Sequence, residues 1–260
     1  MHGICFSPYE GTQEPGDPIS EAQVRRKLEL LVPHTQWIRV FSCTQGNEII
    51  PKLAKEYGFK TLVGAWLGEK ETDKNEEELQ GLIALASAGY VDVAAVGNEV
   101  MYREELEEEE LIEYILRAKQ ALKGIPVGYV DAYYEFTNRP KMTTVCDVIL
   151  ANCYPYWEAC DIDHSLLYMK QMYYQSVQAA SGKRVSITET GWPSSGDALG
   201  AAEPGCENAI KYFINAQAWS QQEGIEMFYF SAFDEGWKVG AEGSVGAFWG
   251  LRDANEQRKF

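Results

Sequence analysis

Long hydrophobic runs are absent from this sequence of 260 residues. No stretch approaches the roughly 20 unbroken apolar residues of a membrane-spanning helix, so no such segment is expected. No Pro/Gly/Ser-rich linker or low-complexity tract divides the chain, which predicts a single domain covering residues 1–260. No signal peptide is visible after Met1. That absence fits a cytoplasmic protein or a mature domain without its leader. We expect the second, a secreted or periplasmic domain whose leader is absent here, with the compartment left open.

Basic residues are scarce relative to acidic ones. The chain has 23 Lys and Arg against 39 Asp and Glu, which gives a net charge of −16 and a pI near 4.7. Such a surface repels phosphates, so nucleic acid is excluded as a partner and a neutral substrate is favoured. We also expect the chain to be a monomer.

Histidines are few, and the cysteines form none of the closely spaced pairs that bind metals. There are three His and six Cys, without a CxxC pair or zinc-type spacing. A disulfide stays possible, whereas no metal site and no cofactor are expected. The group of Asp161, Asp163 and His164 could ligate a cation, but a solvated loop with Asp163 or Ser165 as helix N-cap is favoured.

What the chain does contain is an alternation of strand-like and helix-like segments. Ser20 and Gln23 form a capping box before a helix, and the acidic run 104–110 is interpreted as a solvated helix start rather than a cation site. Eight apolar, strand-like runs alternate with helices, which predicts an α/β fold, a single (β/α)8 TIM barrel. The predicted strands are Gly3–Ser7, Trp37–Ser42, Lys60–Trp66, Asp92–Asn98, Pro126–Asp131, Val148–Tyr154, Arg184–Glu189 and Met227–Phe233.

Two glutamates end the fourth and seventh of these strands. Active sites of such barrels lie at the carboxyl ends of the strands, where Glu99 and Glu189 are placed. Either glutamate alone could be a strand-end residue paired with Arg or Lys, but the two together are typical of glycosidic bond cleavage. That reaction needs a protonated acid at the leaving oxygen and a carboxylate at the anomeric carbon, and separation by about 5–5.5 Å gives retention.

A barrel for phosphorylated substrates is a weaker alternative. It would need a phosphate cradle of backbone amides after strands seven and eight. Those loops instead contain Trp192-Pro193 and the acidic Asp234-Glu235.

The motifs "VGNE", "TETGWPSSG" and "FSAFDEGWK" resemble those of glycoside hydrolase family 17, the β-1,3-glucanases and their transglycosylating relatives. The likeness extends from "GICFSPY" through "WIRVFS" and "ANCYPYW" to "GAFWGLRD". The resemblance implies Glu99 as acid/base and Glu189 as nucleophile. It also implies Asn98 as a ligand of the sugar 2-hydroxyl, Tyr154 near the nucleophile, and Glu235 with Lys238 as a charged pair in the cleft.

Aromatic side chains make up 12% of the chain, which is ample for stacking on sugar rings. Trp192 is predicted to stack on a glucose ring, although Trp-Pro after a strand could also be a packed turn. Trp66, Trp157 and Trp237 are further candidates for lining a curved glucan chain. Where plant and fungal members usually carry Tyr, this chain has Phe41, so one hydroxyl contact is absent.

The resemblance implies a retaining hydrolase of laminarin-type β-1,3-glucan. A transglycosylase that uses the same two glutamates is equally compatible with these motifs, because acceptor choice depends on loop shape. A catalytically inactive glucan-binding barrel is the remaining alternative, and the presence of both carboxylates speaks against it.

Overall fold

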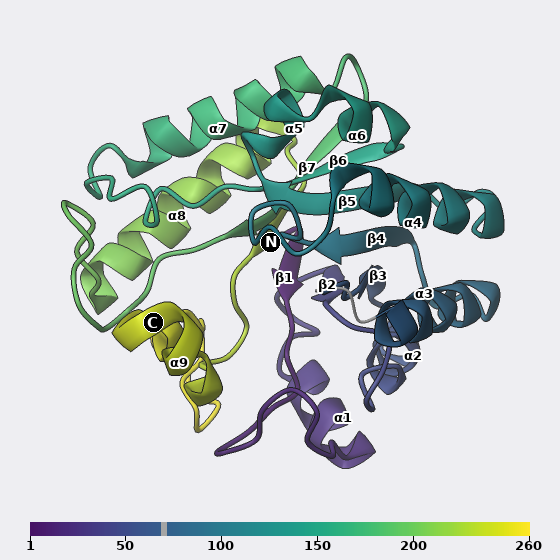
Figure 1. Cartoon of the computed structure of the whole chain (residues 1–260). Helices are drawn as coiled ribbons and strands as arrows, with labels where there is room; N and C mark the ends of the chain where they lie inside the picture. The colour runs from purple at the N-terminus through teal and green to yellow at the C-terminus, as the bar shows by residue number, and fades with distance from the viewer. Residues whose placement is uncertain (69–71) are drawn as a thin grey trace.

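The computed structural model describes residues 1–68 and 72–260 and forms a closed barrel of eight parallel strands in sequence order (Figure 1). The predicted fold class and the number of strands are therefore confirmed. The strands are β1 Gly3–Cys5, β2 Trp37–Val40, β3 Lys60–Ala65, β4 Val93–Asn98, β5 Val127–Ala132, β6 Val148–Asn152, β7 Arg184–Thr190 and β8 Met227–Tyr229.

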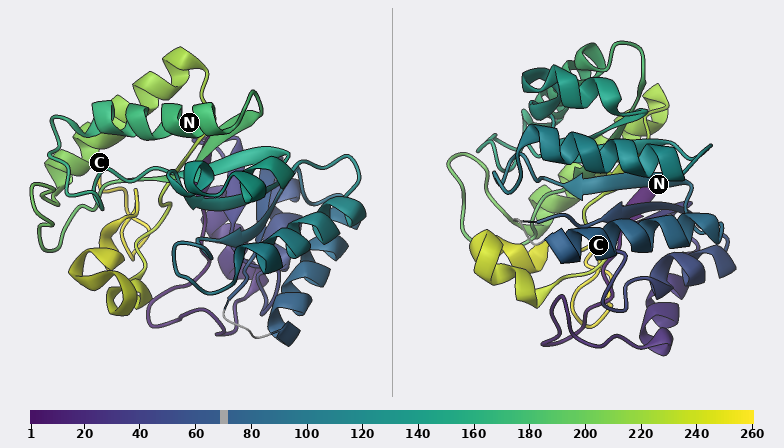
Figure 2. Two further views of the ribbon diagram at one scale, coloured as in Figure 1. Left: turned by 45° about the horizontal axis from the view of Figure 1, so that its top comes forward. Right: turned by 45° about the vertical axis from the view of Figure 1, so that its right-hand side comes forward.

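Helices surround the barrel, as parallel strands buried on both faces require (Figure 2). The α-helices are α1 Glu21–Glu29, α2 Ile49–Glu56, α3 Thr72–Ser87, α4 Glu108–Ala121, α5 Glu135–Asn138, α6 Pro140–Val145, α7 Ser165–Ala179, α8 Cys206–Glu223 and α9 Val239–Glu242. Two 3-10 helices, η1 Gly236–Lys238 and η2 Gly243–Phe248, flank α9 in the segment after β8.

Several strands end earlier than the sequence predicts, and β8 shows the reason. The predicted strand runs to Phe233, whereas β8 ends at Tyr229. The amide of Phe230 still donates to Thr190 of β7, but the chain then leaves this ladder: the amide of Ser231 donates to the carbonyl of Trp249, and the amide of Ala232 donates to that of Cys5. The apolar run continues past the strand because it packs under the returning C-terminal segment.

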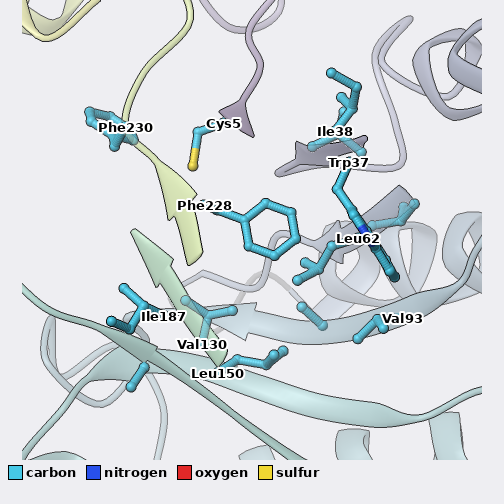
Figure 3. Close-up of a cluster of buried hydrophobic side chains, with 14 of the residues drawn as sticks. Cys5, Trp37, Ile38, Leu62, Val93, Val130, Leu150, Ile187, Phe228 and Phe230 are labelled. Atoms are coloured by element: carbon cyan, nitrogen blue, oxygen red, sulfur yellow. The ribbon is translucent and has the colours of Figure 1, made fainter. Parts of the chain in front are cut away.

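Large apolar side chains such as Trp37 and Phe228 fill the barrel near the amino-terminal ends of the strands (Figure 3). The Phe228 ring meets the Trp37 ring edge-on with centroids 6.1 Å apart. Gly3 on the neighbouring strand makes room for it, because a Cβ there would lie 2.4 Å from a ring carbon of Phe228. Opposite this apolar plug, at or near the carboxyl ends of the strands, lie the polar residues Asn98, Asn152 and Glu189.

Helix starts follow the sequence signals with one exception. Ser20 and Gln23 form the predicted capping box of α1. The acidic run leads into α4, where the amide of Glu107 donates to the carboxylate of Glu110 at 3.0 Å, so its interpretation as a helix start is confirmed. The predicted N-cap of α7 is wrong by one residue, because His164 occupies that position while the Ser165 hydroxyl donates to a backbone carbonyl of the preceding turn.

In the same loop, Asp161, Asp163 and His164 do not come together as the ligands of a cation. Asp163 instead forms an ion pair with Lys211 of α8. Across residues 1–68 and 72–260, no three His, Cys, Asp or Glu side chains gather in a way that could hold a metal ion. No helix within these residues is long and apolar enough to span a membrane. All six cysteines are free thiols, which settles the open disulfide question.

Candidate active site

Glu99 and Glu189 lie next to each other at the carboxyl end of the barrel. The amide nitrogen of Asn152, the last residue of β6, donates to Oε1 of Glu99 at 2.8 Å and to Oε1 of Glu189 at 3.1 Å. The two carboxylate oxygens are therefore separated by less than the sum of these two distances. A single amide that contacts both groups makes them close neighbours, as in retaining glycosidases, whereas the carboxyl groups of inverting enzymes leave room for a water between them. The geometry therefore favours direct attack by one carboxylate.

The Asn152 side chain is itself fixed in orientation. Its oxygen accepts a hydrogen bond from the Thr188 hydroxyl at 2.9 Å, which directs both N–H groups toward the glutamates. Asn152 and Thr188 are buried, so little freedom is left to this amide. A single neutral donor thus spans the gap between the two acidic groups.

Glu189 is held in place by a cation and a phenol. Arg39 of β2, whose side chain is 2% exposed, pairs with Oε1 of Glu189 at 2.7 Å. The Tyr154 hydroxyl donates to Oε2 at 2.8 Å. Burial, and then the nearby Glu189 charge, raise the pKa of Tyr154 well above its usual range, so the hydroxyl keeps its proton and remains a donor. Glu189 therefore presents an oriented, charge-compensated carboxylate.

Glu99 sits in a different environment. It lies after a register irregularity between β4 and β5 and has a φ of +54°, a conformation that costs a non-glycine residue free energy. Its carboxyl has no direct cation partner among the described residues. Desolvation, and then the negative charge of Glu189, raise the pKa of Glu99 to about 8. Near neutral pH this group therefore carries a proton that it can donate.

Asn98 is partly engaged inside the protein. Its side-chain oxygen accepts a hydrogen bond from the second terminal nitrogen of Arg39 at 2.6 Å. Arg39 thereby links the residue before one glutamate to the carboxylate of the other. Within the described residues the Asn98 amide nitrogen has no hydrogen-bond partner, so it is the end of this side chain that can face a ligand.

Glu235 and Lys238 form the charged pair that the sequence predicts. The Lys238 ammonium lies 2.7 Å from Oε2 of Glu235, and the Trp237 indole donates to Oε1 at 3.1 Å. The ammonium also sits 4.0 Å from the centroid of the Phe230 ring. Glu235 and Trp237 line a cavity of about 70 Å³ that also reaches Lys27. Both members of the pair are buried, within the segment that follows β8.

The prediction that Trp192 stacks on a sugar ring is wrong. Its side chain is 1% exposed, and its indole N–H donates to the carbonyl of Glu203 at 2.9 Å. The ring packs between Tyr156 and Tyr212, with centroids 5.3 and 5.5 Å away. The Trp-Pro segment after β7 is a packed turn, which was the competing interpretation.

The other predicted aromatic residues differ in accessibility. Trp157 is 40% exposed and is the most open of them. One face of Trp66 is covered by the Arg103 guanidinium, 4.7 Å from the ring centroid. Phe41 is half-buried beneath Arg39, whose guanidinium lies 4.2 Å from the ring, so it supports the ion pair with Glu189 rather than standing free.

Two residues of this cluster escaped the sequence reasoning, namely Arg39 and Asn152. The signal for Arg39 was present, because an arginine inside the apolar strand "WIRV" is costly to bury without a partner. Asn152 interrupts the equally apolar "VILAN" of β6. Both were treated as ordinary strand residues.

A barrel with two adjoining carboxylates at the ends of β4 and β7 has the architecture of a glycosidase. Residues 3–250 match the family model of the BtgE/BtgC glycoside hydrolase domain. The chain therefore belongs to this family, within glycoside hydrolase family 17, and is a glycoside hydrolase. The family resemblance seen in the sequence is confirmed.

Relatives in fungi match most of the chain. A glucan 1,3-beta-glucosidase of Schizosaccharomyces pombe is 28% identical over 90% of this chain and 78% of its own length. One from Candida albicans is 27% identical over 90% and 83%. An active-site mutant of Rhizomucor miehei beta-1,3-glucanosyltransferase in complex with laminaritriose superposes with a TM-score of 0.87, at 28% identity, covering 99% of this chain and 94% of that one.

Proposed function

We propose that this protein is a retaining glycosidase that cleaves β-1,3-glucan by double displacement, with Glu189 as nucleophile and Glu99 as acid/base. The observation that carries the proposal is the Asn152 amide shared by the two carboxylates, which keeps them close enough for direct attack. The substrate class is supported by the names of the similar fungal enzymes and by the laminaritriose complex of the Rhizomucor enzyme.

The environments of the two glutamates support this division of roles. In the first step Glu189 attacks the anomeric carbon while the Glu99 proton moves to the departing glycosidic oxygen. Arg39 pairs with the Glu189 carboxylate and stabilises its negative charge, whereas Glu99 has a raised pKa and therefore carries the proton. In the second step the Glu99 carboxylate takes a proton from water, whose oxygen displaces Glu189 from the sugar.

Binding of the glucan is assigned to residues around this pair. The unpaired amide nitrogen of Asn98 is suited to donate to the 2-hydroxyl of the sugar that reacts with Glu189. Glu235, Lys238 and Trp237 offer polar and aromatic contacts on the β8 side, and the exposed Trp157 offers a stacking surface. Positioned polar groups of this kind reject substrates that leave them unpaired.

Azide rescue tests the roles separately. In Glu189→Gly, azide should fill the vacated space and give an α-glycosyl azide, whereas in Glu99→Ala it should intercept the glycosyl-enzyme and give the β-product. Each variant alone should lose about 10²–10⁴ in rate or more while keeping its fold. Swapped product configurations would mean that the two assignments are reversed, and near-normal turnover of either variant would exclude the mechanism.

Transfer to a sugar is the second candidate function, favoured by the likeness to the Rhizomucor glucanosyltransferase. The same residues serve it, because an acceptor hydroxyl can replace water in the second step. Incubation with laminari-oligosaccharides separates the outcomes by product mass, since only transfer yields chains longer than the substrate. Comparable rates on carboxymethyl cellulose and laminarin would refute the substrate class for both.

A further inference from the structure

The turn that carries Glu99 is held by the neighbouring strand β5. The amide of Glu99 donates to the carbonyl of Val130 at 2.8 Å, and the amide of Met101 donates to the hydroxyl of Tyr129 at 2.8 Å. Because Glu99 has a positive φ, its turn is not a low-energy conformation on its own. These contacts with β5 are what hold the carboxyl in its place.

Behind this turn lies a carboxylate that the catalytic mechanism does not use. Asp131 of β5 is completely buried. One of its oxygens accepts from the Tyr129 hydroxyl and, at 3.3 Å, from the amide of Tyr102, while the other accepts from the amide of Ala132 at 2.7 Å. Asp131 thus contacts the Glu99 turn both directly and through Tyr129.

The negative charge of Asp131 has no counterion. Among residues 1–68 and 72–260 no Lys, Arg or His forms an ion pair with it, and all three donors that it accepts from are neutral. A buried, unpaired carboxylate costs free energy that a neutral asparagine of the same shape would not. Asp131 lies beside the turn that carries Glu99, so its negative charge can act on that turn.

We propose that Asp131 is a positioning residue for the general acid, acting through Tyr129 on the turn that carries Glu99, and that this task requires its negative charge. The inference rests on the proposed function of Glu99 as acid/base. Asp131 does not touch the substrate in this scheme. It fixes the direction of the Tyr129 hydroxyl, whose oxygen then receives the Met101 amide.

The charged groups around both carboxyls agree in sign with this proposal. Glu189 and Asp131 each raise the pKa of Glu99, whereas the Arg103 guanidinium lowers it. Burial, opposed by the hydrogen bond from Tyr129, raises the pKa of Asp131 itself to about 6, and Glu135 adds to the rise. Asp131 is therefore ionised over the range in which Glu99 loses its proton.

The test is Asp131→Asn, studied through the pH dependence of kcat/KM. We expect kcat/KM for laminari-oligosaccharides to fall at least about tenfold, because acid assistance is weakened, while KM changes little. The alkaline limb should move to lower pH by about half a pH unit or more, because a like charge near Glu99 is gone. With a 2,4-dinitrophenyl β-laminaribioside, whose leaving group needs no proton, kcat/KM should stay within about threefold of wild type.

Two further variants separate charge from shape. Tyr129→Phe keeps the Asp131 charge but removes the hydroxyl, so it should lower kcat without moving the alkaline limb downward. Asp147→Asn is the matched control, because this aspartate also accepts a β5 amide, from Val127, but at the other end of the strand. It should leave both the limb and the leaving-group dependence unchanged.

The proposal is overturned if Asp131→Asn folds normally and loses activity equally on both substrates with an unmoved alkaline limb, since that is the signature of a merely structural residue. Unchanged activity on both substrates would overturn it as well. If Asp131→Asn does not fold, Tyr129→Phe decides, and full activity of that variant is the contrary result. Glu99→Ala is run alongside: its retained activity would refute the proposed function, whereas its loss with an unaffected Asp131→Asn would refute only this inference.

Discussion

Replacing Glu99 and Glu189 by glutamine, one at a time, should change stability in opposite directions. The pKa of Glu99 is raised from 4.5 to about 8 by burial and by Glu189. At 1.36 kcal/mol per pKa unit, ionising Glu99 in the fold costs up to about 5 kcal/mol relative to the unfolded chain. Because Glu99 retains some contact with solvent at the barrel mouth, we expect about 2 kcal/mol of this to be recovered by Glu99→Gln at pH 9.

The sign follows from the direction of the shift in pKa. A carboxyl whose pKa is higher in the folded chain contributes its full stability below the unfolded value of 4.5 and loses it as the pH rises through about 8. The gain from Glu99→Gln should therefore be absent at pH 4, grow between pH 5 and 8, and level off above. Glutamine can still accept the hydrogen bond of Asn152, so little is lost in exchange.

Glu189→Gln should do the reverse. It leaves the Arg39 guanidinium, whose side chain is 2% exposed, without a counterion, and breaking a buried ion pair costs about 3–5 kcal/mol. Part of that cost is offset because the repulsion between the two glutamates disappears. We expect a net loss of at least about 2 kcal/mol at neutral pH.

Urea unfolding of the wild type and both variants at pH 4, 6, 7.5 and 9 measures these differences. Glu77→Gln, which removes an exposed carboxylate of α3, controls for the change in overall charge. A Glu99→Gln variant that is less stable than wild type at pH 9, or a difference that does not vary with pH, would refute the account of the Glu99 environment. A stabilising Glu189→Gln would refute the role given to Arg39.

Two other substitutions test the packing and the hydrogen bonds of the same region. Trp192→Ala should destabilise the fold by about 3–5 kcal/mol, because removal of a buried indole leaves a cavity. A variant with the melting temperature of the wild type and only a raised KM would show instead that Trp192 stacks on the sugar. Tyr154→Phe should lower kcat about 10–100-fold with little change in KM, since the hydrogen bond to a charged Glu189 is worth about 1.5–3 kcal/mol. An unchanged kcat would show that this hydroxyl does not orient the nucleophile.

The barrel and the two glutamates could be predicted because their signals are local. Each strand is a short apolar run, and in a parallel barrel all strands end at the same face, so Glu99 and Glu189 had to approach each other once their strands were recognised. The same reasoning places Asn152 at the end of β6. The neighbouring sequence, however, does not tell whether its side-chain amide bonds to two catalytic carboxylates, as it does, or only to nearby backbone.

The failures have a common physical origin. Whether Trp192 faces a ligand or the core depends on the loop 193–205, whose Glu203 carbonyl captures the indole N–H. Phe41 was judged by the hydroxyl it lacks, although its ring supports the Arg39 guanidinium. In both cases the deciding partner is distant in sequence, so residue type alone does not reveal the direction of the side chain.

The polar residues at the carboxyl end of the barrel, here called the polar layer, lower the stability of the fold. Glu99 has a strained backbone, Asp131 is a buried charge without a counterion, and Arg39 is ionised inside the strands. Asp131 would be cheaper as a neutral residue and Glu99 as a glycine, whereas Arg39 would be cheaper only if its partner Glu189 were replaced as well. These residues occur together in the one layer where both glutamates are held. The apolar plug around Phe228 at the opposite end contributes burial that offsets part of this cost. Substitutions that weaken that plug should therefore unfold the chain without altering the pH profile, whereas substitutions in the polar layer should alter the profile even where they stabilise the fold.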